Sequence, residues 1–237
     1  SELRNFFQRL GRSIKKNSLI LIEITLPPGT CDKVIIPILK KSLKKRRMKL
    51  EDIYLSYSYE RVMPGKEYMN SIINNYRCYA GMNKSSSFKC RNFLRKYINY
   101  KKFPLYEFDN LTDCEAAKIL ENSYRAVNIA FIDEWTKFSA KTKLNLNKII
   151  DAIKFRSTHT NIMRPGLGVG GYCLTKDPDF INFSGKYIFK KKFSFPITNI
   201  SMKINKRMIF STIDFIKEKI KNFRRKKILL LGAAYKD

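Results

Sequence analysis

The sequence has 237 residues, of which 44% are hydrophobic and 13% aromatic, and this composition excludes an intrinsically disordered chain. Its 48 lysine and arginine residues against 20 aspartate and glutamate residues give a formal net charge of +28, which would attract phosphate-bearing partners. No nucleic-acid motif accompanies the basic runs, so lysines spread over solvated faces are the favoured interpretation. No apolar run is long enough for a membrane span and no N-terminal segment is typical of a secretory signal. With one histidine and widely spaced cysteines, a zinc site is not expected.

The first half of the chain predicts alternating helices and strands. Residues 1–18 predict an amphipathic helix, and the apolar run after Ser18 predicts a buried strand that ends at a Pro-Pro-Gly turn. The further elements predicted here are a helix at 31–45, a strand entering a Pro-Gly loop at 53–65, a strand at 77–82 and a helix at 85–98. This order predicts a parallel α/β sheet.

From residue 110 onward the pattern becomes helical. Apolar side chains recur at three- and four-residue steps between Thr112 and Ala140 and predict one long helix, with Thr112 or Asp113 as its N-cap and Glu115 in its first turn. The recurring side chains are those of Ala116, Leu120, Tyr124, Val127, Phe131 and Trp135. Two more helices are predicted at 144–155 and about 198–222, and a strand at 227–231.

A glycine-rich stretch surrounds Cys173. Gly168, Gly170 and Gly171 precede the cysteine, and glycines allow a backbone to approach a ligand closely. Lys176 follows it, and a nearby cation at the start of a helix favours the reactive thiolate. The alternative is a glycine-rich connector with an incidental buried cysteine. Spacing alone leaves these two interpretations equally supported.

Several segments together resemble one family. The run RPGLGVGGYCLTKDP at 164–178 resembles the active-site signature of the UDP-glucose/GDP-mannose dehydrogenase family. SLILIEITLPPGT, YLSYSYERVMPG, EAAKILENSYRAVNIAFIDEW and ILLLGAAYKD resemble further segments of this family, in the same order. The resemblance therefore covers essentially the whole chain.

The resemblance implies an α/β fold in three parts. Residues 1–110 would form the C-terminal half of a Rossmann-like parallel sheet, a partial NAD-binding domain without the glycine-rich fingerprint. Residues 111–222 would form an all-α central dimerisation domain that carries the cysteine loop, and 223–237 would start the UDP-sugar-binding domain with its first strand. We expect a fragment that binds NAD poorly and has little activity alone, because the pyrophosphate loop is missing.

The implied activity is that of an NAD-dependent UDP-sugar 6-dehydrogenase, which supplies polysaccharide precursors. Members of this family oxidise the sugar C6 hydroxymethyl group to a carboxylate and reduce two NAD. Cys173 would be the nucleophile, forming a thiohemiacetal and then a thioester. Lys118 and Asn122, four residues apart on one helix face, would stabilise an oxyanion on C6. Asp177 would orient water or the lysine.

Two further catalytic positions depart locally from the family pattern. Glu60 would perform acid/base work in thioester hydrolysis, although Tyr59 stands where the family has proline. Thr25 would contact nicotinamide and water, with Ile24 in place of the usual serine. From the residues alone, an exposed lysine on an amphipathic helix is the preferred interpretation of Lys118. Asp177 could also be a helix N-cap, and Thr25 an ordinary strand residue.

The remaining implied contacts concern substrate, cofactor and partners. Implied substrate-binding residues are Arg61, Pro64, Arg156, Arg164, Gly166, Gly168, Gly170, Tyr235 and Lys236; implied cofactor-binding residues are Thr25, Glu60, Cys173 and Lys176. We expect NAD, a UDP-sugar, a homodimer through the central helices, a cytoplasmic location, and neither metal nor specific nucleic acid. UDP-glucose and UDP-N-acetyl-hexosamines both remain open as substrates. The alternative function is a basic module without catalysis that binds anions or a partner.

Overall fold

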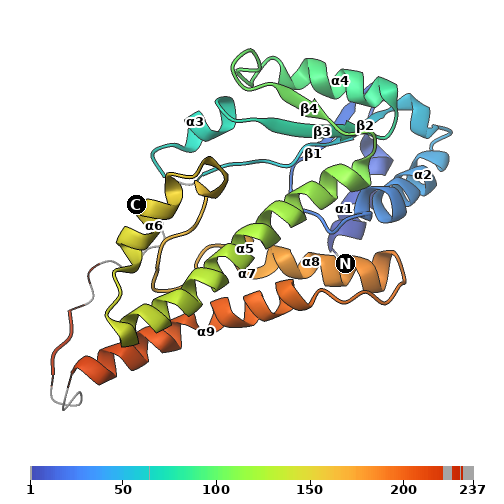
Figure 1. The fold of residues 1–237 in the computed structure, drawn as a ribbon. Helices are drawn as coiled ribbons and strands as arrows, with labels where there is room; N and C mark the ends of the chain where they lie inside the picture. Colours follow the sequence, from blue (N-terminus) through green and yellow to red (C-terminus); the bar gives the residue numbers. More distant parts are fainter. Residues whose placement is uncertain (1, 64, 221–225, 230, 232–237) are drawn as a thin grey trace. The chain divides into compact units, whose positions relative to one another are not determined.

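The computed structural model describes residues 2–63, 65–220, 226–229 and 231, which form two compact units (Figure 1). Unit 1 consists of the described residues up to Ile119 together with Phe180–Phe193. Unit 2 consists of Leu120–Asp179 and the described residues from Ser194 onward. Helix α5 (Leu111–Thr142) begins in unit 1 and continues into unit 2.

Unit 1 is built on a four-stranded sheet. The strands, in the order in which they pair, are β1 (Leu19–Ile22), β2 (Tyr54–Tyr57), β3 (Arg77–Gly81) and β4 (Leu105–Glu107). Pairs β1–β2 and β3–β4 are parallel, so the predicted α/β class is confirmed. The β2–β3 pair is antiparallel, because the chain between them returns through the short helix α3 (Tyr68–Ile73) without a crossover to the opposite end of the sheet.

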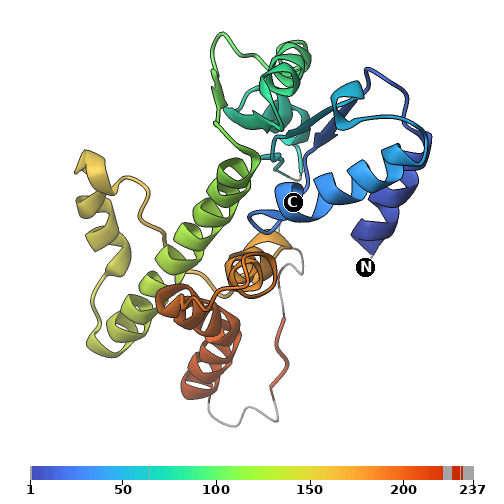
Figure 2. The ribbon, with the colours of Figure 1, turned by 90° about the vertical axis from the view of Figure 1, so that its right-hand side faces the viewer.

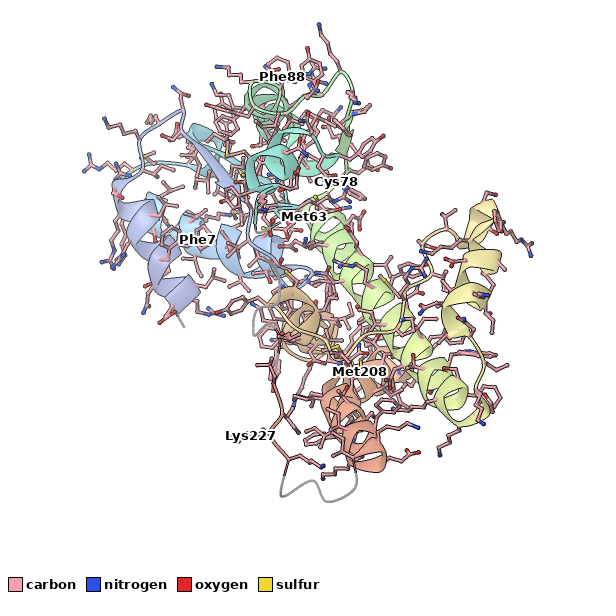
Figure 3. The ribbon with its side chains drawn as sticks, turned by 90° about the vertical axis from the view of Figure 1, so that its left-hand side faces the viewer. Phe7, Met63, Cys78, Phe88, Met208 and Lys227 are labelled. Carbon is pink, nitrogen blue, oxygen red and sulfur yellow. The ribbon has the colours of Figure 1, made fainter. Side chains whose placement is uncertain are left out.

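The helices of unit 1 cover this sheet and carry its core. They are α1 (Glu2–Ser13), η1 (Cys31–Ile35), α2 (Ile36–Lys44), η2 (Leu50–Asp52), α4 (Lys84–Leu94), α8 (Phe180–Phe183) and η5 (Ser184–Ile188). Helices α1 and α2 lie side by side (Figure 2). Phe7 of α1, which is labelled in Figure 3, is buried in the same apolar cluster as Leu39 and Leu43 of α2. A Cβ on Gly11 would lie 2.6 Å from Ser42 Cβ, so only glycine permits this close helix pair.

Unit 2 is helical. Besides its part of α5 it contains α6 (Leu146–Lys154), η3 (Ser157–His159), α7 (Cys173–Lys176), η4 (Asp177–Asp179) and α9 (Pro196–Lys219). Ile132, Leu146 and Ile150 form a small apolar cluster between α5 and α6. Asn205 Nδ2 on α9 donates a 2.9 Å hydrogen bond to the Ala126 carbonyl oxygen on α5. The predicted long helices are therefore confirmed, and packing holds them together.

The N-cap residue of α5 differs from the predicted one. Asn110 Oδ1 accepts a 2.8 Å hydrogen bond from the Asp113 amide, so Asn110 caps the helix. Thr112 and Asp113 already lie inside the helix, which makes their prediction as N-cap wrong. Thr112 Oγ1 instead donates a 2.8 Å hydrogen bond to Asp32 Oδ2, because its side chain faces η1.

The C-terminal strand predicted at 227–231 is not observed. None of the described residues 226–229 and 231 is in a strand. A strand requires a hydrogen-bonded neighbour, and the described part of the chain provides none here. In the described residues, no helix is both long and apolar enough to cross a bilayer.

Candidate active site

Lys118 is buried in unit 1 and its charge has two partners. Only 7% of the residue is exposed. Its Nζ donates a 3.0 Å hydrogen bond to the carbonyl oxygen of Glu60 and lies 5.4 Å from the centre of the Tyr59 ring. A buried ammonium needs such partners to offset its lost hydration. The interpretation of Lys118 as an exposed surface lysine is therefore wrong.

Glu60 follows β2 and is fixed through its backbone. Its amide donates a 3.3 Å hydrogen bond to the carbonyl oxygen of Glu23, so the segments beyond β1 and β2 stay paired past the strands. Its carboxylate Oε2 accepts a 2.5 Å hydrogen bond from the Val62 amide and shapes the following loop. The side chain is half-buried, which leaves a carboxylate near the Lys118 contact within reach of solvent.

Tyr59, the departure from the family's proline, is a site residue that sequence reasoning missed. Its ring is buried and contacts two cations, with Arg61 Cζ at 5.5 Å from the ring centre in addition to Lys118. Arg61 also donates to the Tyr59 hydroxyl at 3.3 Å. The signal in the sequence was an aromatic residue between a predicted strand and a Glu-Arg pair.

Two other predicted site residues belong to unit 1 or its loops. Thr25, beyond β1, is half-buried, and Pro64 lies outside the described residues.

Glu115 is the second residue whose surroundings the sequence did not reveal. It is completely buried, and its two carboxylate oxygens accept hydrogen bonds from the amides of Gly29 (2.6 Å) and Cys31 (2.8 Å). Burial raises the pKa of Glu115 to about 7, against the opposing effect of these hydrogen bonds. A carboxyl group that titrates near neutral pH therefore lies one helical turn before Lys118.

The five cysteines differ in burial, and none forms a disulfide bond. Cys173 is exposed, Cys78 is half-buried, and the other three are buried. Burial raises the pKa of Cys90 to about 12, and it raises the pKa values of Cys31 and Cys114 further above their usual range. These three thiols are therefore unreactive, while Cys173 is open to a ligand.

In unit 2, Asn122 and Asp177 form a buried polar pair. Asn122 Nδ2 donates a 2.9 Å hydrogen bond to Asp177 Oδ2, and both residues are almost fully buried. Cys173 begins the single turn of α7, and the Asp177 amide donates to the Cys173 carbonyl oxygen at the end of that turn. The backbone of one short helix thus joins the exposed thiol to the buried pair.

The loop before Cys173 is anchored at few points. Arg164 forms an ion pair with Asp151, and the Leu167 carbonyl oxygen accepts a 3.0 Å hydrogen bond from Thr212 Oγ1. A Cβ added at Gly166 or Gly168 would meet no atom within 4 Å. The backbone at these glycines is therefore open for a ligand to approach.

The other predicted site residues are not gathered by any such contact. Arg156 and Lys176 are exposed and Gly170 is half-buried, while Tyr235 and Lys236 lie outside the described residues. Within the residues described, no cluster of three histidine, cysteine or acidic side chains has the arrangement of a metal site. The structure thus brings together Lys118 with Glu60 in unit 1, and Asn122 with Asp177 in unit 2.

Comparison with family models assigns both halves of the chain to the same family. Residues 1–99 match the NAD binding domain of the UDP-glucose/GDP-mannose dehydrogenase family, and residues 112–207 match its central domain. The second match includes Lys118, Asn122, Cys173 and Asp177.

Individual proteins agree with these matches. A UDP-N-acetyl-D-mannosamine dehydrogenase of Methanococcus vannielii is 31% identical over 227 residues, which is 94% of this chain and 47% of the relative. Among solved structures, a UDP-D-ManNAc dehydrogenase from Pyrococcus horikoshii has a TM-score of 0.77 at 28% identity, covering 92% of this chain and 49% of that one. The UDP-N-acetyl-mannosamine dehydrogenase of Staphylococcus aureus has a TM-score of 0.74 at 28% identity, with 94% and 48% covered. The chain spans about half the length of the curated relatives it matches.

Proposed function

The chain belongs to the UDP-glucose/GDP-mannose dehydrogenase family, and on this premise we propose that it carries catalytic residues of an NAD-dependent UDP-sugar 6-dehydrogenase. The observation that carries this proposal is the burial of Lys118 and Asn122 on α5, each with a polar partner from the segments that resemble the family's active site. Buried charged and polar side chains are costly, so their presence along one helix supports a functional role.

NAD is the cofactor of the matched domain, and the described residues fit its nicotinamide half. The parallel strands β1 and β2 end at the same edge of the sheet, and Thr25 and Glu60 follow them. Dinucleotides bind beyond the carboxyl ends of parallel strands. Thr25 and Glu60 of unit 1 would hold the nicotinamide half. For Cys173 and Lys176 of unit 2, a cofactor contact rests on the family resemblance alone. NAD, when bound, accepts the hydride in each of two oxidations.

Cys173 would act as the covalent nucleophile. Its thiolate adds to the C6 aldehyde of the sugar, forming a carbon–sulfur bond and an oxyanion on the former carbonyl oxygen. Oxidation of this thiohemiacetal gives a thioester. Water then adds to the thioester carbonyl, the carbon–sulfur bond breaks, and the thiolate leaves with the bonding electrons, which yields the carboxylate. The exposure of Cys173 supports this role, because the sulfur must reach the substrate.

The roles of the other catalytic residues follow from the family resemblance, and the contacts of these residues support them. Lys118 and Asn122 would stabilise the oxyanion through an ammonium and an amide N–H. Asp177, bonded to Asn122, would orient that amide and the attacking water. Glu60, half-buried with its backbone fixed, would move protons during thioester hydrolysis. Tyr59 would hold Lys118 in place through its ring.

UDP-N-acetyl-mannosamine is the proposed substrate. The UDP-N-acetyl-D-mannosamine dehydrogenases among the relatives support this choice over UDP-glucose. Arg61, Arg156, Arg164, Pro64, Gly166, Gly168, Gly170, Tyr235 and Lys236 are the proposed substrate contacts. Carboxylate products of such sugars serve as polysaccharide precursors.

The proposal is tested by turnover and by thiol chemistry. The chain is incubated with NAD and either UDP-N-acetyl-mannosamine or UDP-glucose, and NADH and the uronate product are measured. The pH dependence of Cys173 alkylation is followed separately, since buried Cys31 and Cys114 would label slowly whatever the role of Cys173. We expect Cys173 to be alkylated faster near neutral pH than a free cysteine, together with slow but measurable product from the N-acetyl sugar. Absence of product together with alkylation like that of a free cysteine would reject the proposal.

A homodimer through α5 is the proposed assembly. Leu120, Tyr124, Phe131 and Trp135 lie on one side of this helix and are 42–71% exposed, an apolar stripe that a second copy would cover. Sedimentation of the unmodified chain and of the Phe131→Glu variant tests this proposal, and a monomer for both over a wide concentration range would contradict it.

A reducing, cytoplasmic location is proposed from the cysteines, because none of the five forms a disulfide bond.

Anion binding is the second candidate function. A hollow of about 380 Å³ between α1 and α2 is lined by Arg4, Gln8, Arg12, Lys33, Val34, Pro37, Ile38, Lys41, Ser42 and Lys45, with no carboxylate in the described lining. Five cations at such a groove attract polyphosphates in a salt-dependent way. If this is the main function, the double variant Lys33→Glu/Lys41→Glu should bind sodium tripolyphosphate more weakly than the unmodified chain. The double variant Lys141→Glu/Lys148→Glu, which lies outside the groove, should keep the binding affinity of the unmodified chain. Equal weakening by both pairs would exclude a dedicated site.

A further inference from the structure

The turn Pro27–Cys31 joins β1 to the helical stretch formed by η1 and α2. Such strand–turn–helix junctions leave unpaired backbone N–H groups at the helix start, and in many nucleotide-binding proteins a phosphate occupies them. Here these groups are already occupied, because Glu115 accepts hydrogen bonds from the Gly29 and Cys31 amides. The carboxylate therefore stands where an anionic ligand would otherwise bind.

The same turn is held from its other side by the segment 184–189, which also belongs to unit 1. Ser184 Oγ donates a hydrogen bond to the Pro28 carbonyl oxygen. Gly29 has φ +84°, and a Cβ added there would lie 3.0 Å from both Ile188 Cγ2 and Phe189 Cζ. The turn is therefore in contact with both α5 and the segment 184–189, and its positive φ favours glycine at position 29.

Glu115 also connects this turn to the proposed catalytic residues of unit 1. Thr25 lies two residues before Pro27, and Lys118 lies three residues after Glu115 on the same rigid helix. The Thr112–Asp32 hydrogen bond joins the same two elements at the surface. One fully buried carboxylate thus accepts two hydrogen bonds from amides that lie 86 and 84 residues away in the sequence, and it joins the turn to α5.

We propose that Glu115 is a positioning residue that locks the turn Pro27–Cys31 onto α5 and thereby fixes the distance between Thr25 and Lys118. The contacts of Glu115 stand by themselves, whereas the roles of Thr25 and Lys118 rest on the proposed function. Active groups need placement within about half an ångström, which a buried bidentate acceptor provides and a surface contact does not.

The ionisation state of Glu115 adjusts this lock. The carboxylate accepts from both amides, whereas the neutral acid carries a proton on one oxygen and holds one amide less well. Burial raises the pKa of Glu115 to about 7, so the change falls near neutral pH. The groups facing it are Cys31 and Asp32 from η1, Tyr57 from β2 and Cys114 from α5. Burial raises the pKa values of both thiols and of Tyr57, so these three stay neutral throughout this range.

The test compares Glu115→Gln and Glu115→Ala with the unmodified chain and with Glu134→Gln, a matched loss of charge at an exposed position of α5. Hydrogen exchange of the Gly29 and Cys31 amides is measured at pH 8, with the β2 amides as reference. We expect at least about tenfold faster exchange at one of the two amides in Glu115→Gln and at both in Glu115→Ala. The β2 amides and Glu134→Gln should keep wild-type rates.

Two outcomes would overturn the proposal. Unchanged exchange at Gly29 and Cys31 in Glu115→Gln would mean that the carboxylate does not hold the turn. Equal acceleration throughout unit 1 would mean that Glu115 only stabilises the fold. If the variants do not fold, the unmodified chain still decides: corrected for intrinsic rates, exchange at these two amides should follow the titration of Glu115 between pH 6 and 8 more steeply than exchange at the β2 amides, and a flat profile contradicts the lock.

Turnover provides a separate measurement of positioning. In Glu115→Gln, kcat should fall about tenfold while KM for the UDP-sugar stays within about twofold, because the substrate contacts are intact. Wild-type kcat in this variant, despite faster exchange, would overturn the link to Thr25 and Lys118. Absence of turnover in the unmodified chain, together with alkylation of Cys173 like that of a free cysteine, would reject the proposed function, and the exchange result would still stand.

Discussion

Glu115 in unit 1 is surrounded by closely packed atoms, whereas Cys173 in unit 2 is exposed to solvent. Glu115 has no exposed surface, and both its carboxylate oxygens accept hydrogen bonds. A Cβ added at its partner Gly29 would lie 3.0 Å from the side chains of Ile188 and Phe189. Cys173 is exposed, and glycines of the loop before it would meet no atom if they gained a Cβ.

The difference follows from what each region does in the proposed reaction. A nucleophile must meet a substrate, so its surface stays open and its loop gains few contacts. A positioning group contributes only if it does not move, so it is buried and all its hydrogen bonds are made. Mutation at Cys173 should therefore affect catalysis alone, whereas mutation at Glu115 should affect both stability and the placement of the proposed catalytic residues.

The largest effect is expected for Cys173→Ala. Formation of uronate should fall at least about a thousandfold, because the covalent route is lost. The melting temperature should stay within about 2 °C of wild type, since the side chain is exposed. Product quantified by mass spectrometry and a thermal melt measure the two quantities. Retention of a tenth of the activity, or a large drop in melting temperature, would break the contrast between the regions.

The next effect is the pH dependence of stability due to Glu115. Its pKa in the folded chain, about 7, lies above the ordinary value of 4.5. The folded state therefore holds a proton that the unfolded state has lost, and the associated stability is fully present below about pH 4.5 and disappears as pH rises through 7. Relative to Glu115→Gln, wild type should lose up to roughly 3 kcal/mol of unfolding free energy over this window.

Urea unfolding at pH 5 and at pH 7.5 measures this difference, and subtracting the variant cancels the titration of all other groups. The loss concerns global stability, because a buried charge is costly even when both of its hydrogen bonds are made. A constant difference between the two proteins at both pH values would show that Glu115 titrates as an ordinary carboxyl group.

Asn122→Leu tests whether unit 2 contains a locked region of its own. The change leaves the buried Asp177 Oδ2 without its amide partner, so we expect a loss of about 2 kcal/mol in unfolding free energy. Asn161→Ala removes an exposed amide hydrogen bond, to the Tyr124 hydroxyl, and should stay within about 0.5 kcal/mol. Equal losses in the two variants would mean that burial does not distinguish these amides.

The smallest effect comes from one alanine placed in each region. Gly29→Ala places a Cβ close to Ile188 and Phe189 on a backbone with φ +84°, which L-residues rarely adopt. It should lower the free energy of unfolding by about 1–2 kcal/mol. Gly166→Ala meets open space and should change stability by less than about 0.5 kcal/mol. Chemical denaturation of both variants compares them directly. A cost at Gly166 as large as that at Gly29 would remove the difference in packing between the regions.

Much of the fold could be predicted from local patterns. The strands near residues 19–22, 54–57 and 77–81 and the four longest helices lie where periodicity and turn residues predicted them. Strand β4 was missed, because three residues carry too little periodicity. The strand predicted at 227–231 lacks a partner among the described residues, and pairing is a property of two segments that one segment cannot encode.

The sequence by itself determined the spacing and the residue types of the proposed catalytic residues. Lys118 and Asn122 share a helix face because they are four residues apart, and the glycines before Cys173 define an open loop by their composition. These features follow from covalent spacing and residue type, which hold before any packing occurs.

Only the tertiary structure decided what those residues touch. Asn122 pairs with Asp177 across 55 residues, and Glu115 holds amides more than 80 residues away. It also decided which side of α5 is covered: Glu115 and Lys118 are buried, while Leu120 and Trp135 remain exposed. Periodicity identifies a face of a helix and not the element that covers it, because burial depends on contacts between segments distant in sequence.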